Sequence, residues 1–320
     1  MNIEQAIVIK GKTKLEQLVT KFNTKAQARF YIEQNFVNFK KSKEAAKEAK
    51  FDEVEEENEV FHQSLSNVER ELSKRMKIKV IDREFLSSFI FSEKNLIVVV
   101  GQDGLVANTA KYVNGLPIIA VNPDKSSYDG QLLPFDESDF LAAVENVLAD
   151  RYRFKNVTMA EARMNDGQRL LAFNDLFIGV SSHVSARYRV NFNNKAEDHS
   201  SSGIIVSTGA GSTGWLSSVF NMANSVFANF GGLHQRLTSQ LAWDDERLMF
   251  IVREPFMSKM SQANIVSGMI SKGNSLTLES KIPANGVIFS DGIEKDFIQF
   301  NSGSIAVIGI APEKAKLVVK

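Results

Sequence analysis

The hydrophobic positions of the first 136 residues form short apolar runs separated by longer stretches of helical periodicity. Runs rich in β-branched residues predict buried strands, and they cover residues 5–11, 79–82, 95–101 and 117–123. Strands that alternate with helical stretches are typical of a parallel sheet covered on both faces. We therefore expect residues 1–136 to form an α/β domain.

The pattern changes after a helix predicted over residues 137–150. Closely spaced strand-like segments follow, at 151–158, 169–180 and 183–192 and again in the late runs of the chain. This density of strands favours a mostly antiparallel β domain over residues 137–310. The boundary between the two domains is expected near Asp136.

Charged residues dominate a segment from about 39 to 75, which begins basic (Lys40, Lys41, Lys43) and then turns acidic. Opposite charges four residues apart stabilise an exposed helix, so we expect one long charged helix rather than a nucleic-acid site. Its apolar positions recur at near-helical spacing and predict one face that packs on the sheet or on a dimer partner. These positions are Val60, Phe61, Leu65, Val68 and Leu72.

Composition narrows the possible functions. The 320 residues carry 38 basic and 38 acidic side chains, so no net charge favours nucleic acid or an anionic membrane. Cysteine is absent, which excludes disulfides and thiolate chemistry and favours a reducing cytoplasm. The chain starts with a short strand-like run rather than a signal peptide, and no run reaches the ~18 apolar residues of a membrane helix. The four histidines show no metal-ligand spacing, and we predict no protein metal site.

Two glycine-rich turns carry the candidate chemistry. Gly101, Gln102, Asp103 and Gly104 follow the apolar run 95–100 and precede a helix predicted over 105–113. Glycine backbone and a helix N-terminus together favour a polyphosphate. The alternative is a plain structural turn in which Asp103 caps the helix.

The second turn, residues 208–215, follows a strand predicted over 204–207 and precedes a helix predicted over 216–228. It combines three glycines with the hydroxyls of Thr208, Ser212 and Thr213. Such a turn suits nucleotide binding, whereas the alternative is a flexible turn in which Ser212 caps the helix.

With these turns the chain resembles the NAD kinase family, over roughly residues 95–320. Residues 101–105 resemble the family's G-G-D-G-T turn, and Asn174 with Asp175 resembles its Asn-Glu pair. Residues 208–215 resemble its T-P-T-G-S-T-A-Y segment, and residues 290–292 resemble its late Asp-Gly turn. The chain departs from the family pattern at several positions. These are Gln102, Leu105, Gly209, Ala210, Gly214 and Trp215, together with Ser202 where the family usually has an aspartate.

The resemblance implies a Rossmann-like first domain, a β-rich second domain, and C-terminal strands from about residue 311 that return to the first domain. It also implies ATP with Mg²⁺ as phosphoryl donor, NAD as acceptor phosphorylated on its adenosine ribose 2′-hydroxyl, and a homodimer or homotetramer. Asp103 is then the catalytic residue. The residues implied to bind ATP or NAD are Gly101, Gly104, Asn174, Asp175, Ser202, Thr208, Gly211, Ser212, Thr213, Gly214, Trp215 and Ser218.

Three alternatives remain open at this stage. One is a kinase of the same fold that phosphorylates a sugar or nucleoside, and another is a lipid kinase. The third is a nucleotide-binding sensor without catalysis. The sequence also leaves open whether ATP, another triphosphate or polyphosphate is the donor.

Overall fold

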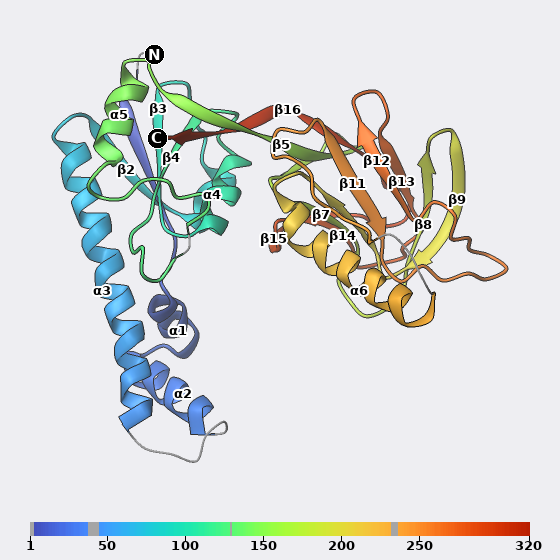
Figure 1. The fold of residues 1–320 in the computed structure, drawn as a ribbon, viewed down its shortest axis with the longest axis horizontal. Helices are drawn as coiled ribbons and strands as arrows, with labels where there is room; N and C mark the ends of the chain where they lie inside the picture. Colours follow the sequence, from blue (N-terminus) through green and yellow to red (C-terminus); the bar gives the residue numbers. More distant parts are fainter. Residues whose placement is uncertain (1–2, 38–44, 129, 232–235) are drawn as a thin grey trace. The chain divides into compact units, whose positions relative to one another are not determined.

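The computed structural model describes residues 3–37, 45–128, 130–231 and 236–320, which form two compact units (Figure 1). The first unit comprises Met1–Phe154 with Leu317–Lys320, and the second comprises Lys155–Lys316. The sequence placed the boundary earlier, near Asp136. The helix that follows Asp136 belongs to the first unit because its Phe140, Val144 and Val147 are buried in the core of the first sheet.

The first unit contains a parallel sheet in the strand order β2-β1-β3-β4, with every neighbouring pair parallel. Its strands are β1 (Gln5–Lys10), β2 (Lys77–Asp82), β3 (Asn95–Val100) and β4 (Pro117–Val121). The five residues of β4 are all buried, as expected of a strand covered on both faces. The four strands match the four predicted runs.

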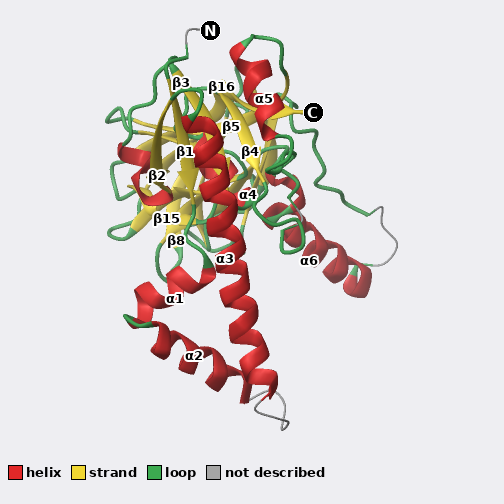
Figure 2. Cartoon of the chain, turned by 90° about the vertical axis from the view of Figure 1, so that its left-hand side faces the viewer, coloured by secondary structure: helices red, strands yellow, loops and turns green. Residues whose placement is uncertain are grey.

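The helices of the first unit are α1 (Lys14–Phe22), α2 (Lys25–Val37), α3 (Ala45–Ser73), α4 (Asp103–Ala110) and α5 (Phe140–Leu148), with a 3-10 turn η1 (Arg83–Ser88). Figure 2 shows α1 and α2 beside the N-terminal half of α3. Leu15, Ile32, Phe51 and Val54 form a small apolar cluster between these three helices. The N-terminal part of α3 therefore packs on helices rather than on the sheet.

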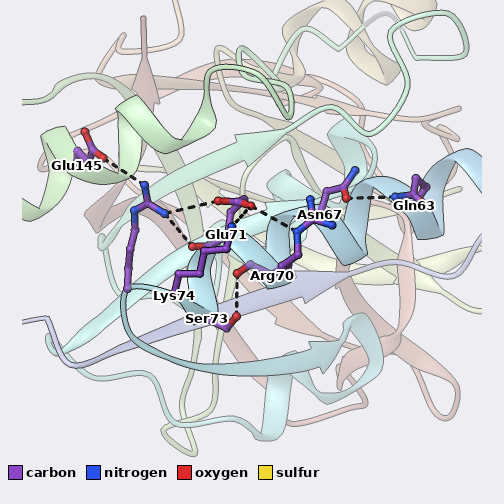
Figure 3. Close-up of polar contacts among 8 residues, drawn as sticks. Gln63, Asn67, Arg70, Glu71, Ser73, Lys74 and Glu145 are labelled. Atoms are coloured by element: carbon purple, nitrogen blue, oxygen red, sulfur yellow. Dashed lines mark hydrogen bonds and ion pairs between the residues drawn. The ribbon is translucent and has the colours of Figure 1, made fainter.

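The C-terminal half of α3 packs on the sheet. Phe61, Leu65, Val68 and Leu72 are buried with residues of the parallel strands, whereas Val60 is exposed. On the outer side, Glu71 pairs with Arg70 and Lys74, and Gln63 hydrogen-bonds to Asn67 (Figure 3). The helix predicted over 39–75 is thus confirmed from residue 45 onward, and its apolar face covers the sheet. Residues 39–44 of that prediction lie outside the described residues.

The strands of the second unit fall into two groups of hydrogen-bonded neighbours, and two of them extend into the first unit, because β5 begins there and β16 ends there. In one group the order is β16-β13-β8-β9, with β5 beside β16 and β6 beside β5. In the other group the order is β12-β11-β10-β7-β14-β15, and every neighbouring pair is antiparallel. The strands are β5 (Arg153–Met164), β6 (Arg169–Ala172), β7 (Asp175–Val180), β8 (Ala186–Phe192), β9 (Lys195–Ser201), β10 (Ile204–Ser207), β11 (Arg247–Val252), β12 (Ser267–Ser271), β13 (Leu276–Ser280), β14 (Gly286–Ser290), β15 (Ile293–Gln299) and β16 (Ile305–Val319). The 3-10 turn η2 (Gly211–Thr213) and helix α6 (Trp215–Phe230) follow β10.

One apolar core joins these two groups of strands. It includes Val190 of β8 and Leu278 of β13 from one side. From the other side it includes Ile178 of β7, Val206 of β10 and Phe250 of β11. Alternate residues of β8 are buried, which is the period of a strand with one face on the core. The predicted fold class, a parallel α/β part followed by a mostly antiparallel β part, is confirmed. None of the described helices is long and apolar enough to span a membrane.

The packing of α3 on the sheet predicts the effect of one substitution. Leu72 is fully buried there, so Leu72→Ala should lower the free energy of unfolding by about 2–5 kcal/mol through lost burial and the cavity left behind. Val60→Ala on the exposed side should change it by less than about 0.5 kcal/mol. Urea unfolding of both variants measures the difference. Equal small effects would show that this face of α3 is not packed in solution.

Candidate functional site

The first glycine turn joins β3 to α4. Gly101 directly follows β3 with φ of 154°, and a Cβ on it would lie 3.0 Å from the Leu105 side chain. Glycine adopts this backbone conformation without strain. The Gly101 N–H donates to the carbonyl of Val121, the last residue of β4, at 3.4 Å. The turn is therefore fixed at the carboxyl edge of the parallel strands, where open α/β sheets bind ligands.

Asp103 is the first residue of α4 and Gly104 the second. The Asp103 Oδ1 accepts the N–H of Leu132 at 2.8 Å, and Oδ2 accepts the N–H of Gln131 at 3.2 Å. The N-cap of α4 is Gln102, so the alternative in which Asp103 caps this helix is wrong. Each carboxylate oxygen has about two lone-pair sites, so each retains one for a substrate hydroxyl or a cation.

In the second unit, the strand predicted over 169–180 is interrupted. β6 ends at Ala172 and β7 begins at Asp175, so Phe173 and Asn174 form the link between them. Thr208 holds this link, because its Oγ1 donates to the Phe173 carbonyl at 2.6 Å and its N–H donates to the Asn174 carbonyl at 2.9 Å. The Asn174–Asp175 motif and the second glycine turn therefore lie side by side.

Asp291, from the late Asp-Gly turn, joins the same cluster. Its carboxylate accepts the N–H groups of Phe173 at 3.1 Å, Asn174 at 2.6 Å and Asp175 at 3.2 Å. Its own N–H donates to the Asp175 carbonyl at 2.9 Å. Three motifs that are far apart in the sequence thus meet at the link between β6 and β7.

Gly211 and Ser212 give the second turn its shape. A Cβ on Gly211 would lie 2.3 Å from the Asn174 carbonyl oxygen, so only glycine fits this close approach. The buried Ser212 Oγ donates to the Gly209 carbonyl at 2.7 Å and accepts the Leu241 N–H at 3.2 Å. The N-cap of α6 is Gly214, so Ser212 closes the turn and the capping alternative is wrong.

The residues that continue into α6 are more open. Thr213, Gly214 and Ser218 are exposed, and the Ser218 Oγ donates to the Gly214 carbonyl at 3.4 Å. Trp215 is half-buried and stacks on Phe177, with ring centroids 5.6 Å apart and an interplanar angle of 15°.

Arg253 links Trp215 to Ser202. Its guanidinium carbon lies 5.5 Å from the centroid of the Trp215 ring, a distance suited to a cation–π contact. Its carbonyl accepts the N–H of Ser202 at 3.0 Å. The Ser202 side chain is exposed in the turn between β9 and β10. Ser202 is therefore tied to Arg253 by its backbone, while its side chain is open to solvent.

The electrostatics of the cluster centre on Asp175. Burial raises the pKa of Asp175 to about 7, the nearby Ser207 hydroxyl opposes this rise, and the negative charge of Asp291 adds to it. Although the residue as a whole is only partly buried, its Oδ1 is fully enclosed and has no hydrogen-bond partner within the described structure. This carboxyl group therefore exchanges its proton near neutral pH.

A cavity of about 360 Å³ lies next to the second turn. Thr213, Ser217 and Asn221 line it from η2 and α6, and the segment 236–240 lines it from the opposite side. The Asn224 amide fixes that segment, because it donates to the Leu237 carbonyl at 3.0 Å and accepts the Leu237 N–H at 2.9 Å. The sequence contained no sign of this cavity, since residues 236–240 match no motif.

Gly101, Asp103 and Gly104 belong to the first unit, and the other predicted site residues belong to the second. Sequence reasoning did not assign site roles to Asp291, Arg253, Gln131 or Leu132. Asp291 was recognisable from its Asp-Gly turn, whereas the other three carry no local signal. No group of three or more histidine and carboxylate side chains with metal-binding geometry occurs among the residues that the structure describes.

Comparisons with known proteins support the resemblance that the motifs indicated. A NAD kinase from Heliobacterium modesticaldum is 32% identical over 129 residues, which is 38% of this chain and 44% of that protein. A NAD kinase from Clostridium kluyveri is 29% identical over 132 residues, which is 39% of this chain and 45% of that protein. The chain thus spans less than half the length of these curated relatives. No protein-family model matches it.

The fold comparison covers the whole chain. A crystal structure of yeast NADH kinase in complex with NADH aligns with a TM-score of 0.54 at 13% identity, over 100% of this chain and 84% of that chain. At this identity the likeness concerns the fold. Together, the relatives and the fold confirm the resemblance to the NAD kinase family.

The raised pKa of Asp175 predicts a pH-dependent stability. The folded protein binds this proton more tightly than the unfolded chain, whose aspartates have a pKa near 3.8. The stability contributed by the group is therefore full below about pH 4 and is lost as the pH rises through 7. The unfolding free energy of Asp175→Asn, relative to the unsubstituted protein, should increase from pH 5 to pH 8.

Urea unfolding at several pH values measures this difference. Asp166→Asn is the matched control, because Asp166 lies in an exposed turn and hydrogen bonds from Gln168 hold its pKa below the usual value. Its stability difference should stay constant from pH 5 to 8. An equally constant difference for Asp175→Asn would contradict the assignment of a near-neutral pKa.

Proposed function

We propose that this chain is an ATP-dependent phosphotransferase that phosphorylates the adenosine ribose 2′-hydroxyl of NAD and so produces NADP. The observation that carries this proposal is the likeness to curated NAD kinases together with the family's four motifs in their usual order. The clustering of three of these motifs around Asp291 supports it.

Phosphoryl transfer depends mainly on positioning and on neutralising charge. The turn from Gly101 to Gly104 faces the carboxyl edge of the parallel strands, which suits the phosphates of ATP. Asp103 orients the acceptor hydroxyl and accepts its proton, using the lone pairs that Gln131 and Leu132 leave free.

The cluster in the second unit serves as the acceptor site in this proposal. Asn174 and Asp175 hydrogen-bond to the adenosine of NAD, and Thr213 and Gly214 lie against its base. Trp215 contacts a ring of the dinucleotide, and Ser218 and Ser202 hold it through their exposed hydroxyls. Thr208, Gly211 and Ser212 give the turn its shape.

Magnesium would enter with the nucleotide. Mg²⁺ prefers oxygen ligands and is usually bound by one or two carboxylates together with substrate phosphates and water. Asp103 fits this role, since its carboxylate oxygens lie at the glycine turn and each retains a free lone pair. The ion would neutralise charge on the transferred phosphoryl group.

The proposal also covers the binding partners, the cellular location and the oligomeric state of the protein. Balanced charge favours small-molecule substrates over nucleic acid or a membrane surface. The absence of cysteine from the sequence favours the cytoplasm. By resemblance to the family, we propose a homodimer or homotetramer.

The first test replaces the proposed base. Asp103→Asn should lower kcat by about 10²–10⁴-fold, the usual contribution of a general base, because the amide cannot accept a proton. Purified protein is assayed with ATP and Mg²⁺ against NAD, NADH, nucleosides and sugars, and the phosphorylated product is identified.

Asp139→Asn is the matched control, since Asp139 also accepts a backbone N–H, that of Asp136 at 2.8 Å, but lies away from the glycine turn. It should retain full turnover. An unchanged kcat in Asp103→Asn would remove Asp103 from the mechanism. If no substrate of the panel is phosphorylated by the unsubstituted protein, while NAD still binds, the chain is a sensor rather than a kinase.

The second test concerns Ser202, where the family usually has an aspartate. A hydrogen bond to a charged group is worth about 1.5–3 kcal/mol and a neutral one about 0.5–1.5 kcal/mol. Ser202→Asp should therefore lower the KM for NAD on the order of tenfold. The kcat should change little, because this contact stabilises ground state and transition state alike.

Ser66→Asp is the control, since it adds the same charge at an exposed position of α3 in the first unit. Its KM should equal that of the unsubstituted protein. The acceptor assignment is wrong if neither the unsubstituted protein nor Ser202→Asp phosphorylates NAD while both phosphorylate a smaller hydroxyl compound. The alternative of a sugar or nucleoside kinase then replaces it.

A further inference from the structure

Tyr128 connects the longest helix of the first unit to the loop that follows β4. Its hydroxyl donates to the Glu57 Oε1 of α3 at 2.6 Å. Its carbonyl accepts the Asn122 Nδ2 at 3.2 Å. Tyr128 is thus held at the tip of its side chain and at its backbone.

The environment of the Tyr128 phenol shifts its acidity. Burial raises the pKa of Tyr128 to about 12, the hydrogen bond to Glu57 adds to this rise, and the Gln102 side chain opposes it. The phenol therefore keeps its proton at neutral pH and donates it to Glu57.

Asn122 connects Tyr128 to the residues that hold Asp103, because its Nδ2 donates to the Tyr128 carbonyl and lies against Gly130. Gly130 turns the chain with φ of 63°, and a Cβ on it would lie 2.7 Å from the Asn122 Nδ2. The next two residues, Gln131 and Leu132, donate their N–H groups to the Asp103 carboxylate. Asn122 thus contacts both Tyr128 and Gly130, the residue just before the two amides that orient Asp103.

We propose that Tyr128, held by Glu57 of α3 at its hydroxyl and by Asn122 at its carbonyl, is a positioning residue that fixes the Asp103 carboxylate for phosphoryl transfer. Tyr128 acts through the Gln131 and Leu132 amides, not by touching the substrate. The expected effect on turnover rests on the proposed function. The expected effect on the Gln131 and Leu132 amides does not depend on which acceptor is phosphorylated.

Tyr128→Phe is the central test, because it removes only the hydroxyl. Misplacing a reacting group by about 1 Å costs on the order of 10²-fold in rate, so we expect kcat to fall roughly 10- to 100-fold. The KM for NAD should stay within about twofold, since Tyr128 does not contact the acceptor. Tyr152→Phe, which removes a hydroxyl elsewhere in the first unit, should keep the normal kcat.

A pair of substitutions at Glu57 separates positioning from general stability. Glu57→Gln keeps a carbonyl oxygen that accepts the Tyr128 hydroxyl, so it should retain most of the turnover. Glu57→Ala removes the acceptor but favours the helix, so it should reproduce the loss seen in Tyr128→Phe. Normal kcat in both Tyr128→Phe and Glu57→Ala would overturn the proposal. Equal losses in Glu57→Gln and Glu57→Ala, or losses that follow a lowered Tm, would do so as well.

Hydrogen exchange provides a readout that needs no activity. The Gln131 and Leu132 amides should exchange more slowly in the unsubstituted protein than in Tyr128→Phe, and Tyr152→Phe should match the unsubstituted protein. If the protein fails to phosphorylate NAD but shows this exchange pattern, the proposed function is wrong and the Tyr128 hold on the amides stands. If exchange at these amides is the same in all three proteins, the positioning role is refuted whatever the activity.

Discussion

The carboxylate of Asp291 is the contact on which the candidate acceptor site depends. It accepts three consecutive backbone N–H groups, those of Phe173, Asn174 and Asp175. Hydrogen bonds to a charged group are each worth about 1.5–3 kcal/mol, so one side chain stabilises the whole link between β6 and β7. The same negative charge, together with burial, raises the pKa of Asp175. One residue therefore fixes the shape of the cluster and tunes its proton affinity.

Backbone amides orient a carboxylate in the first unit as well. Asp103 accepts two N–H groups from the loop after β4, and this leaves its oxygens with lone pairs for further contacts. Asp291 accepts three consecutive amides of the link between β6 and β7.

Three of the departures from the family pattern differ in the surroundings of their side chains. Gln102 lies where its side chain affects the pKa of Tyr128, and Trp215 stacks on Phe177 with Arg253 near its ring. Ser202 stays exposed and is tied to Arg253 through the backbone alone. The first two replacements add contacts within the protein, whereas the third leaves a smaller, neutral group facing solvent. In the proposed function, Ser202 therefore concerns the choice of acceptor more than stability.

The sequence by itself determined the secondary structure and the chemical motifs, because these depend on local signals. Apolar β-branched runs specified β1, β3 and β4, and glycine spacing specified both turns. It also showed that α3 has an apolar face, but not whether that face covers a sheet or a dimer partner.

Only the tertiary structure decided the contacts between residues distant in the sequence. It placed α3 on the sheet, Asp291 on the Phe173–Asp175 backbone, and Tyr128 between Glu57 and the loop that orients Asp103. The pKa of Asp175 belongs here too, since it arises from burial and from a carboxylate more than a hundred residues later. Burial and charge proximity exist only once distant segments have packed together, so no local pattern encodes them.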